Sequence, residues 1–203
     1  MEFKRLHGRE ATLCAAIGCV GALLFLFVFP MGSISTLMHD VLGLPGPGAG
    51  IALVLGPIVI LAAVISVIIT RGTGGALTAS LGFGLTCGLL LWLFQIPTNP
   101  KGAFGSLPFI AVLALAGLVA DASTMLGRTL KLPWRSVLTG ASLNAVLLTF
   151  YWLLIFPSPD EWVKWGDVPL LMGLCLGCGA VSGYIAYALS RAFSPTFPPQ
   201  ERE

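Results

Sequence analysis

The chain has 203 residues, of which 56% are hydrophobic and only 10% are charged. Soluble domains carry about 25% charged residues, so this composition excludes an ordinary soluble domain and predicts an all-α protein that crosses a membrane several times. The net charge of +2 comes without a basic stripe, which argues against nucleic-acid binding. The elements to expect are therefore long apolar helices.

Six apolar runs are long enough to cross a bilayer as helices, at about 1.5 Å per residue. The first run follows the basic segment 1–10 and is longer than the core of a signal peptide, so we expect it to be retained. Gly- and Pro-rich or basic turns separate the runs. We expect a single six-helix domain over 11–193 and a disordered tail over 194–203, with helices at 11–30, 49–70, 76–95, 107–126, 134–156 and 168–193.

The distribution of positive charge predicts the orientation of this bundle. With the N-terminus inside, nine of the eleven Lys and Arg residues lie on the inner side, all except Lys101 and Lys164. Cytoplasmic segments carry such an excess, which predicts that both termini are cytoplasmic and that the chain is a multi-pass protein of the cell membrane. The longest outer connection is then 31–48, a loop rich in Pro and Gly that has the character of a lid.

Two polar side chains lie within the expected spans. Asp121 is the one clear charge, and such a residue is either a proton, cation or partner-binding site, or a shallow carboxylate paired with Arg71 or Arg128. Asn144 lies in the middle of the fifth run, where its amide needs hydrogen-bond partners. Those partners are either a neighbouring helix or a bound ligand.

Aromatic and polar residues collect at the expected outer ends of the helices. Aromatic belts at the membrane surface account for many such residues. Together with a buried amide and a lid-like loop, they also have the composition of a small-molecule pocket, with aromatic walls and a few polar groups. The residues that we expect to bind a ligand are His39, Asp40, Trp92, Gln95, Asn144, Tyr151 and Trp152.

Enzyme and metal motifs are absent from the sequence: it contains no HExxH, GxSxG or Walker A pattern. The two histidines fall on opposite sides of the membrane in the expected topology, so we expect no metal site, no cofactor and no enzymatic activity of the chain itself. Cys175 and Cys178 have CxxC spacing, but they lie within an apolar run, where packing is the simpler interpretation.

Residues 46 to 85, GPGAGIALVLGPIVILAAVISVIITRGTGGALTASLGFGL, carry a resemblance to a known family. Their order is a Gly/Pro entry, a helix that contains Gly-Pro, a short Arg-Gly turn and a helix rich in Gly and Ala. This order resembles the substrate-binding S components of energy-coupling factor (ECF) transporters, loosely of the hydroxymethylpyrimidine or thiamine type. Ala11 and Ala15 are similar to the Ala-xxx-Ala element by which the first helix of these proteins contacts its partner.

The resemblance implies a six-helix, vitamin-binding subunit with a pocket that opens outward and is closed by the loop after the first helix. It implies a small organic substrate, a membrane-embedded coupling subunit and two ATPases as partners, in addition to membrane lipid. The alternative from a different class is a structural or assembly subunit of a membrane complex, without a ligand. A third interpretation is an intramembrane enzyme, which only Asp121 and the CxxC pair support.

Overall fold

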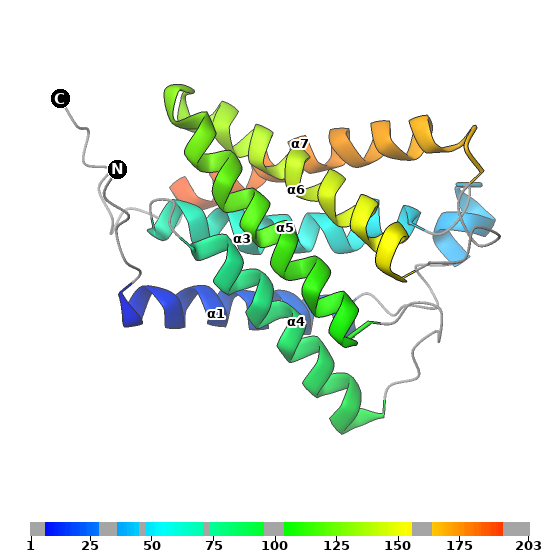
Figure 1. The fold of residues 1–203 in the computed structure, drawn as a ribbon, viewed down its shortest axis with the longest axis horizontal. Coiled ribbons are helices and arrows are strands. Elements are labelled where there is room, and N and C mark those ends of the chain that lie inside the picture. The colour runs from blue at the N-terminus through cyan, green and yellow to red at the C-terminus, as the bar shows by residue number, and fades with distance from the viewer. Residues whose placement is uncertain are drawn as a thin grey trace.

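The computed structural model describes residues 7–28, 36–44, 48–70, 74–95, 104–155 and 164–192, and these residues contain helices and turns but no strand. Six helical segments among them are long and apolar enough to cross a membrane, which confirms the predicted all-α bundle of six helices. The expected tail, 194–203, lies outside the described residues. The helices are α1 (Gly8–Leu23), α3 (Gly56–Thr70), α4 (Gly75–Phe94), α5 (Leu107–Leu126), α6 (Leu132–Ile155) and α7 (Val168–Ala192) (Figure 1).

Four short turns of different helical pitch join or extend these helices. Three are π-helical, namely η1 (Leu24–Val28), η2 (Leu37–Val41) and η3 (Ile51–Leu55), and η4 (Gly127–Thr129) is a 3₁₀ turn. The sequence predicted a loop over 31–48, but its described part contains the helical turn η2. Leu44 closes this turn by donating its N–H to the carbonyl of Met38, after Gly43 in a left-handed conformation.

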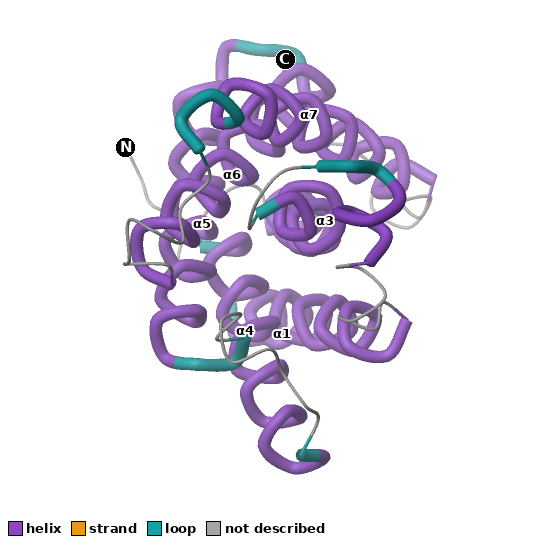
Figure 2. Tube along the Cα trace, turned by 90° about the vertical axis from the view of Figure 1, so that its right-hand side faces the viewer, coloured by secondary structure: helices purple, strands orange, loops and turns teal. Residues whose placement is uncertain are grey.

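Helix α3 is the centre of the bundle. It is the most apolar of the six spans and the most buried, and it packs against α1, α4, α6 and α7. Figure 2 shows α3 end-on between α7 and α1. A helix that is apolar on all sides can lie in such a position, and the small residues Ala62, Ala63 and Ser66 let its neighbours approach closely.

Small residues also set the two closest helix crossings around α3. A Cβ atom at Gly183 of α7 would collide with the Ser136 carbonyl of α6. A Cβ atom at Gly18 of α1 would likewise collide with the Ala79 carbonyl of α4. Helices gain no hydrophobic drive to associate in lipid, so backbones that approach this closely supply packing energy instead.

The ends of the bundle differ in character. One end carries the start of α1, the turn between α5 and α6 and the end of α7, and we call it the basic end because Arg9, Arg128, Lys131, Arg135 and Arg191 lie there. We call the opposite end, with Phe25, Phe104, Tyr151 and Trp152, the aromatic end. Because the chain crosses the membrane an even number of times, six, the start of α1 and the end of α7 lie on the same side of it (Figure 1). That this side is cytoplasmic stays a prediction.

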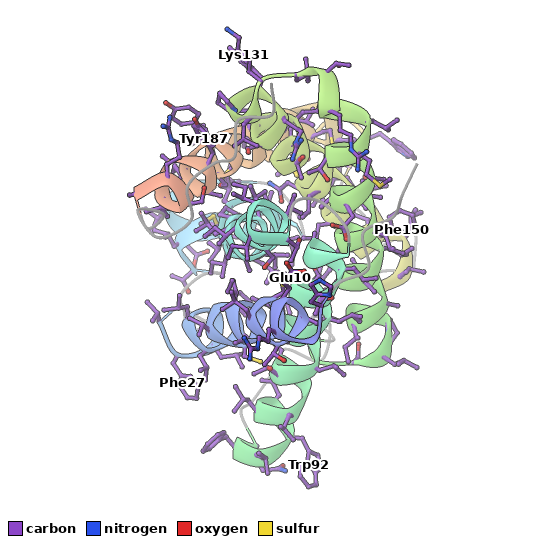
Figure 3. All side chains as sticks on the ribbon, turned by 90° about the vertical axis from the view of Figure 1, so that its left-hand side faces the viewer. Glu10, Phe27, Trp92, Lys131, Phe150 and Tyr187 are labelled. Atoms are coloured by element: carbon purple, nitrogen blue, oxygen red, sulfur yellow. The ribbon has the colours of Figure 1, made fainter. Side chains whose placement is uncertain are left out.

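Helix α4 departs from the bundle toward its C-terminal end, as Figures 1 and 3 show. Trp92 lies at the far tip of this segment and is 70% exposed, and Leu89 and Leu93 are also exposed. The helix ends at Gln95, whose backbone is left-handed and whose side-chain amide donates to the Trp92 carbonyl. The projecting turns are thus apolar on several sides.

The glycines of α7 give a matched test of the helix crossings. Gly183→Ala should destabilise the purified chain by about 1–3 kcal/mol, because the new methyl group overlaps the α6 backbone. Gly177→Ala should leave stability unchanged or slightly higher, because its Cβ position is open and Ala favours helix. Thermal unfolding in one mild detergent measures both, and equal effects of the two substitutions would contradict the assigned crossing.

Candidate functional site

The aromatic end contains a set of five rings from four different parts of the chain, which we call the aromatic cluster: Phe25, Phe83, Phe104, Phe109 and Tyr151. Phe104 is at its centre. Its ring centroid lies 5.8 Å from that of Phe25, 5.2 Å from that of Phe109 and 6.3 Å from that of Tyr151. The centroids of Phe25 and Phe83 are 6.0 Å apart. Such tilted and edge-to-face pairs are favourable arrangements of aromatic rings.

Phe104 enters the cluster because the turn before α5 packs tightly on α4. Gly105 has a φ of 76°, and a Cβ atom there would lie 2.8 Å from the Cα of Gly88. Both glycines are needed for this approach, since a side chain on either would separate the turn from the helix. Ser106 then caps α5 by accepting a hydrogen bond from the Phe109 N–H at 3.4 Å.

Asn144 of α6 is fully buried and connects three helical segments. Its Nδ2 donates to the carbonyl of Ala52 in η3 at 3.0 Å and to the carbonyl of Cys175 in α7 at 2.8 Å. Its Oδ1 has no hydrogen-bond partner among the described residues and faces the backbone of Gly56, where a Cβ atom would collide with it. The amide nitrogen thus makes two hydrogen bonds, and the amide oxygen makes none within the described part of the chain.

The reason that Ala52 needs a donor from elsewhere lies in the sequence of α3. The N–H of Gly56 donates to Ile51, which is the i→i+5 pattern of a π turn. In that pattern the Ala52 carbonyl would accept from residue 57, but residue 57 is proline and has no N–H. Ala52 is fully buried, so the Asn144 amide replaces the missing donor.

The segment that leads into η3 rests directly on α6. Gly48 has a φ of 125°, and a Cβ atom there would lie 2.8 Å from both Leu148 Cδ1 and Trp152 Nε1. Asn144, Leu148 and Tyr151 share one buried face of α6, and Trp152 is buried beside it. Positions 144, 148 and 151 follow helical spacing, so this common face is predictable from the sequence.

The structure therefore brings three of the seven expected ligand-binding residues together: Asn144, Tyr151 and Trp152. His39 and Asp40 lie exposed on η2, where the His39 Nδ1 is 2.9 Å from the Leu44 carbonyl. Trp92 and Gln95 lie on the projecting end of α4 and are not placed with the others (Figure 3). Much of the expected lid, including 31–35 and 45–47, lies outside the described residues.

Sequence reasoning missed four members of the aromatic cluster: Phe25, Phe83, Phe104 and Phe109. A phenylalanine in an apolar run is indistinguishable from a lipid-facing residue by composition, and nothing in its spacing shows which neighbour it meets. The Gly105 that positions Phe104 was a visible signal, because a glycine beside an aromatic residue before a helix is typical of a tight turn.

Asp121 lies at the opposite, basic end and is buried. Its two carboxylate oxygens accept hydrogen bonds from the N–H groups of Ala76 at 3.2 Å and Leu77 at 3.1 Å. These are free donors in the first turn of α4, whose own N-cap is Gly74 and has no side chain to offer. Asp121 therefore caps α4 from a neighbouring helix. Arg71, a partner suggested by the sequence, lies outside the described residues.

The remaining expected sites have simpler surroundings. Ala15 of α1 lies against α4, since a Cβ atom at Gly82 would be 2.8 Å from the Ala15 carbonyl, and Ala11 is partly exposed. A partner contact through these two alanines stays a prediction. All five cysteines are free, and Cys175 is buried beside Asn144. Within the described ranges, no group of three His, Cys, Asp or Glu residues is arranged to hold a metal ion.

Comparison with solved structures places this arrangement in a known fold. The chain is similar to a protein described as an S-component of an ECF transporter, with a TM-score of 0.69 over 93% of this chain and 86% of that chain. The two sequences are 19% identical, so the likeness establishes the fold. No family model and no curated protein matches the sequence. The chain is thus a multi-pass membrane protein with the six-helix fold of an ECF S-component.

The cap on α4 can be tested by hydrogen exchange. Asp121→Ala should speed amide exchange at Ala76 and Leu77 roughly five-fold, because losing a helix cap costs about 1 kcal/mol. Thr124→Val is the control, since that hydroxyl bonds the carbonyl of Asp121 in its own helix and does not touch α4. Unchanged exchange in the Asp121 variant would show that another group caps α4.

The role of Pro57 can be tested by a double-mutant cycle with Asn144. Asn144→Leu should destabilise the chain by about 1–3 kcal/mol, because it leaves the buried Ala52 carbonyl without a donor. In a Pro57→Ala background the same substitution should cost less, because the new N–H at residue 57 supplies that donor. Unfolding in detergent gives the coupling energy, and additive effects would refute the explanation.

Proposed function

We propose that the chain is the substrate-binding subunit of an ECF-type uptake transporter in the cell membrane. In this proposal, it takes a small organic molecule, a vitamin or a vitamin precursor, from the outer face of the membrane. One observation carries the proposal. The amide nitrogen of Asn144 is bonded, its oxygen has no partner among the described residues, and the side chain lies on the same face of α6 as Tyr151 of the aromatic cluster. The shared fold supports it, because the protein with that fold is described as an S-component.

The chemistry of the aromatic end suits such a ligand. Aromatic rings stack on a planar molecule. The Oδ1 of Asn144, which has no partner among the described residues, would accept a hydrogen bond from an N–H or O–H group of that molecule. A ligand reaches this oxygen only if the segment over Gly56 moves, because the oxygen now faces that backbone. Tyr151 and Trp152 are then the walls of the site.

The segment that must move is the lid, residues 31–48, together with η3. Gly48 rests on Trp152, and η3 meets α3 at Gly56-Pro57, where the i→i+4 hydrogen bonding is interrupted. In this proposal the junction is the hinge of the lid, and His39 and Asp40 are exposed groups carried on it. A coupling subunit in the membrane and two ATPases would supply the energy, since the chain itself has no nucleotide-binding motif.

A structural or assembly subunit without a ligand is the competing function, and one observation favours it. The nitrogen of the Asn144 amide already bonds two backbone carbonyls, which is sufficient reason to retain a buried Asn. The open helix face at Gly173 and Gly177 would then be the contact with other subunits. Gly173→Leu or Gly177→Leu would break a complex of that kind. If the chain is instead a substrate-binding subunit, the same substitutions would leave substrate uptake unchanged.

Affinity purification in mild detergent tests the two functions against each other. We expect a second membrane protein and a pair of ATPases to co-purify, and heating to release a small organic molecule. Asn144→Leu should reduce the amount of released molecule at least ten-fold, the cost of one hydrogen bond in a buried site, while the chain still inserts into the membrane.

Thr139→Val is the matched control for this substitution. Thr139 is also buried on α6, but its hydroxyl bonds the Arg135 carbonyl of its own helix, away from the aromatic cluster. That variant should retain the molecule at the wild-type level. Co-purification of other membrane proteins without an ATPase or a ligand would reject the transport proposal, and unchanged ligand in Asn144→Leu would remove Asn144 from the site.

A further inference from the structure

The turn between α5 and α6 at the basic end combines cationic side chains with exposed apolar side chains. Leu126 is 83% exposed and Trp134 is 65% exposed, and both lie at the ends of membrane-spanning helices, where exposed side chains face lipid. Leu130 and Leu132 are also exposed. Arg128 and Lys131 lie between these apolar residues in the chain, and Arg135 directly follows Trp134.

The two arginines lie together across this turn. The stem of Arg135 folds over η4, where a Cβ atom at Gly127 would lie 3.0 Å from Arg135 Cγ. Arg135 is close enough to Arg128 for their positive charges to repel each other. A pair of neighbouring guanidinium groups suits an anion, because each offers a planar fork of N–H donors to phosphate oxygens.

The protein itself does not neutralise these charges within the described residues. Asp121, the nearest acid along α5, has both oxygens occupied by the α4 backbone. Glu10 accepts from the His7 N–H at the start of α1, and Asp40 and Asp167 lie at the aromatic end. Among the described residues, no acidic side chain is therefore available to pair with Arg128, Lys131 or Arg135, and an external anion can bind them.

Position in the membrane decides which anion this is. The turn ends two spanning helices, so its side chains lie at the boundary between headgroups and acyl chains. Figure 3 shows Lys131 at the periphery of the basic end, directed away from the helices. Trp favours this boundary, and exposed leucines beside it lie in acyl chains. A free phosphate would contact the arginines alone, whereas a phospholipid would also place acyl chains against the exposed apolar side chains beside them.

We propose that this turn is a binding site for an anionic phospholipid, with the headgroup phosphate between Arg128 and Arg135 and the acyl chains against Leu126, Leu130 and Trp134. Lys131 adds long-range attraction to the negative headgroup. Each cationic residue near a charged membrane surface contributes roughly 1 kcal/mol. The site lies at the opposite end of the bundle from the aromatic cluster, so it does not depend on the proposed transport function.

Native mass spectrometry of the detergent-purified chain with equimolar dioleoylphosphatidylglycerol and dioleoylphosphatidylcholine tests this proposal. The wild-type chain should retain phosphatidylglycerol preferentially. The double variant Arg128→Gln, Arg135→Gln should bind it roughly 30-fold more weakly, and the double variant with Lys at both positions should keep most of the preference. Arg191→Gln is the control, because this basic residue lies at the same end but donates to Tyr187 instead.

Two further measurements distinguish a site for a phospholipid from a site for a small anion. Trp134→Ala should weaken phosphatidylglycerol binding with all three cations intact, and inorganic phosphate at millimolar concentration should not displace the lipid. Displacement by phosphate together with wild-type binding in Trp134→Ala would overturn the lipid assignment. Retained preference in the double Gln variant would overturn the site itself, and the Lys variant shows that a loss does not come from misfolding.

Discussion

The hydrogen bonds of the Asn144 amide are the interaction on which the arrangement of the aromatic end depends. Pro57 interrupts the backbone hydrogen bonding of the central helix and leaves the buried carbonyl of Ala52 without its usual donor. The amide from α6 supplies the missing donor to Ala52 and at the same time binds Cys175 of α7. One side chain thus fixes the relative position of η3, α6 and α7, and the glycines at 56 and 179 give it room.

This constraint also explains why a polar site and an aromatic cluster lie together. The interrupted helix provides a short segment, from Gly48 to Leu55, that rests on Leu148 and Trp152. The rings nearby come from η1, α4, α6 and the segment 104–109 at the start of α5, so the cluster depends on several elements at once. A change at one junction therefore alters the packing of several helices.

Much of the fold was accessible from sequence because bilayer thickness leaves little choice. Six apolar runs of about 20 residues, punctuated by Gly, Pro and basic turns, predict six spans, and the structure confirms the bundle. The shared face of Asn144, Leu148 and Tyr151 followed from helical periodicity alone. Contacts between helices did not follow, because an apolar residue looks the same whether it faces lipid or protein.

Two particular residues illustrate this limit. Trp92 had the composition of a pocket wall, yet it lies on a segment of α4 that departs from the bundle, and only the crossing angle of α4 determines that. Asp121 had the composition of an ion site or a salt bridge, and its oxygens bind the start of α4. No spacing rule connects residues 44 or 45 positions apart, so these bonds could not be read from the chain.

The projecting helix α4 also has a mechanical consequence. It is held at its start by Asp121 and touches the turn before α5 at Gly88, about 18 Å further along at 1.5 Å per residue. A rotation of about 5° around its capped start would displace Gly88 by roughly 1.6 Å over that length. Gly105 and Phe104 would have to follow, because the two glycine backbones are in contact. A partner that displaces the exposed end of α4 would thus also move Phe104, the central ring of the aromatic cluster.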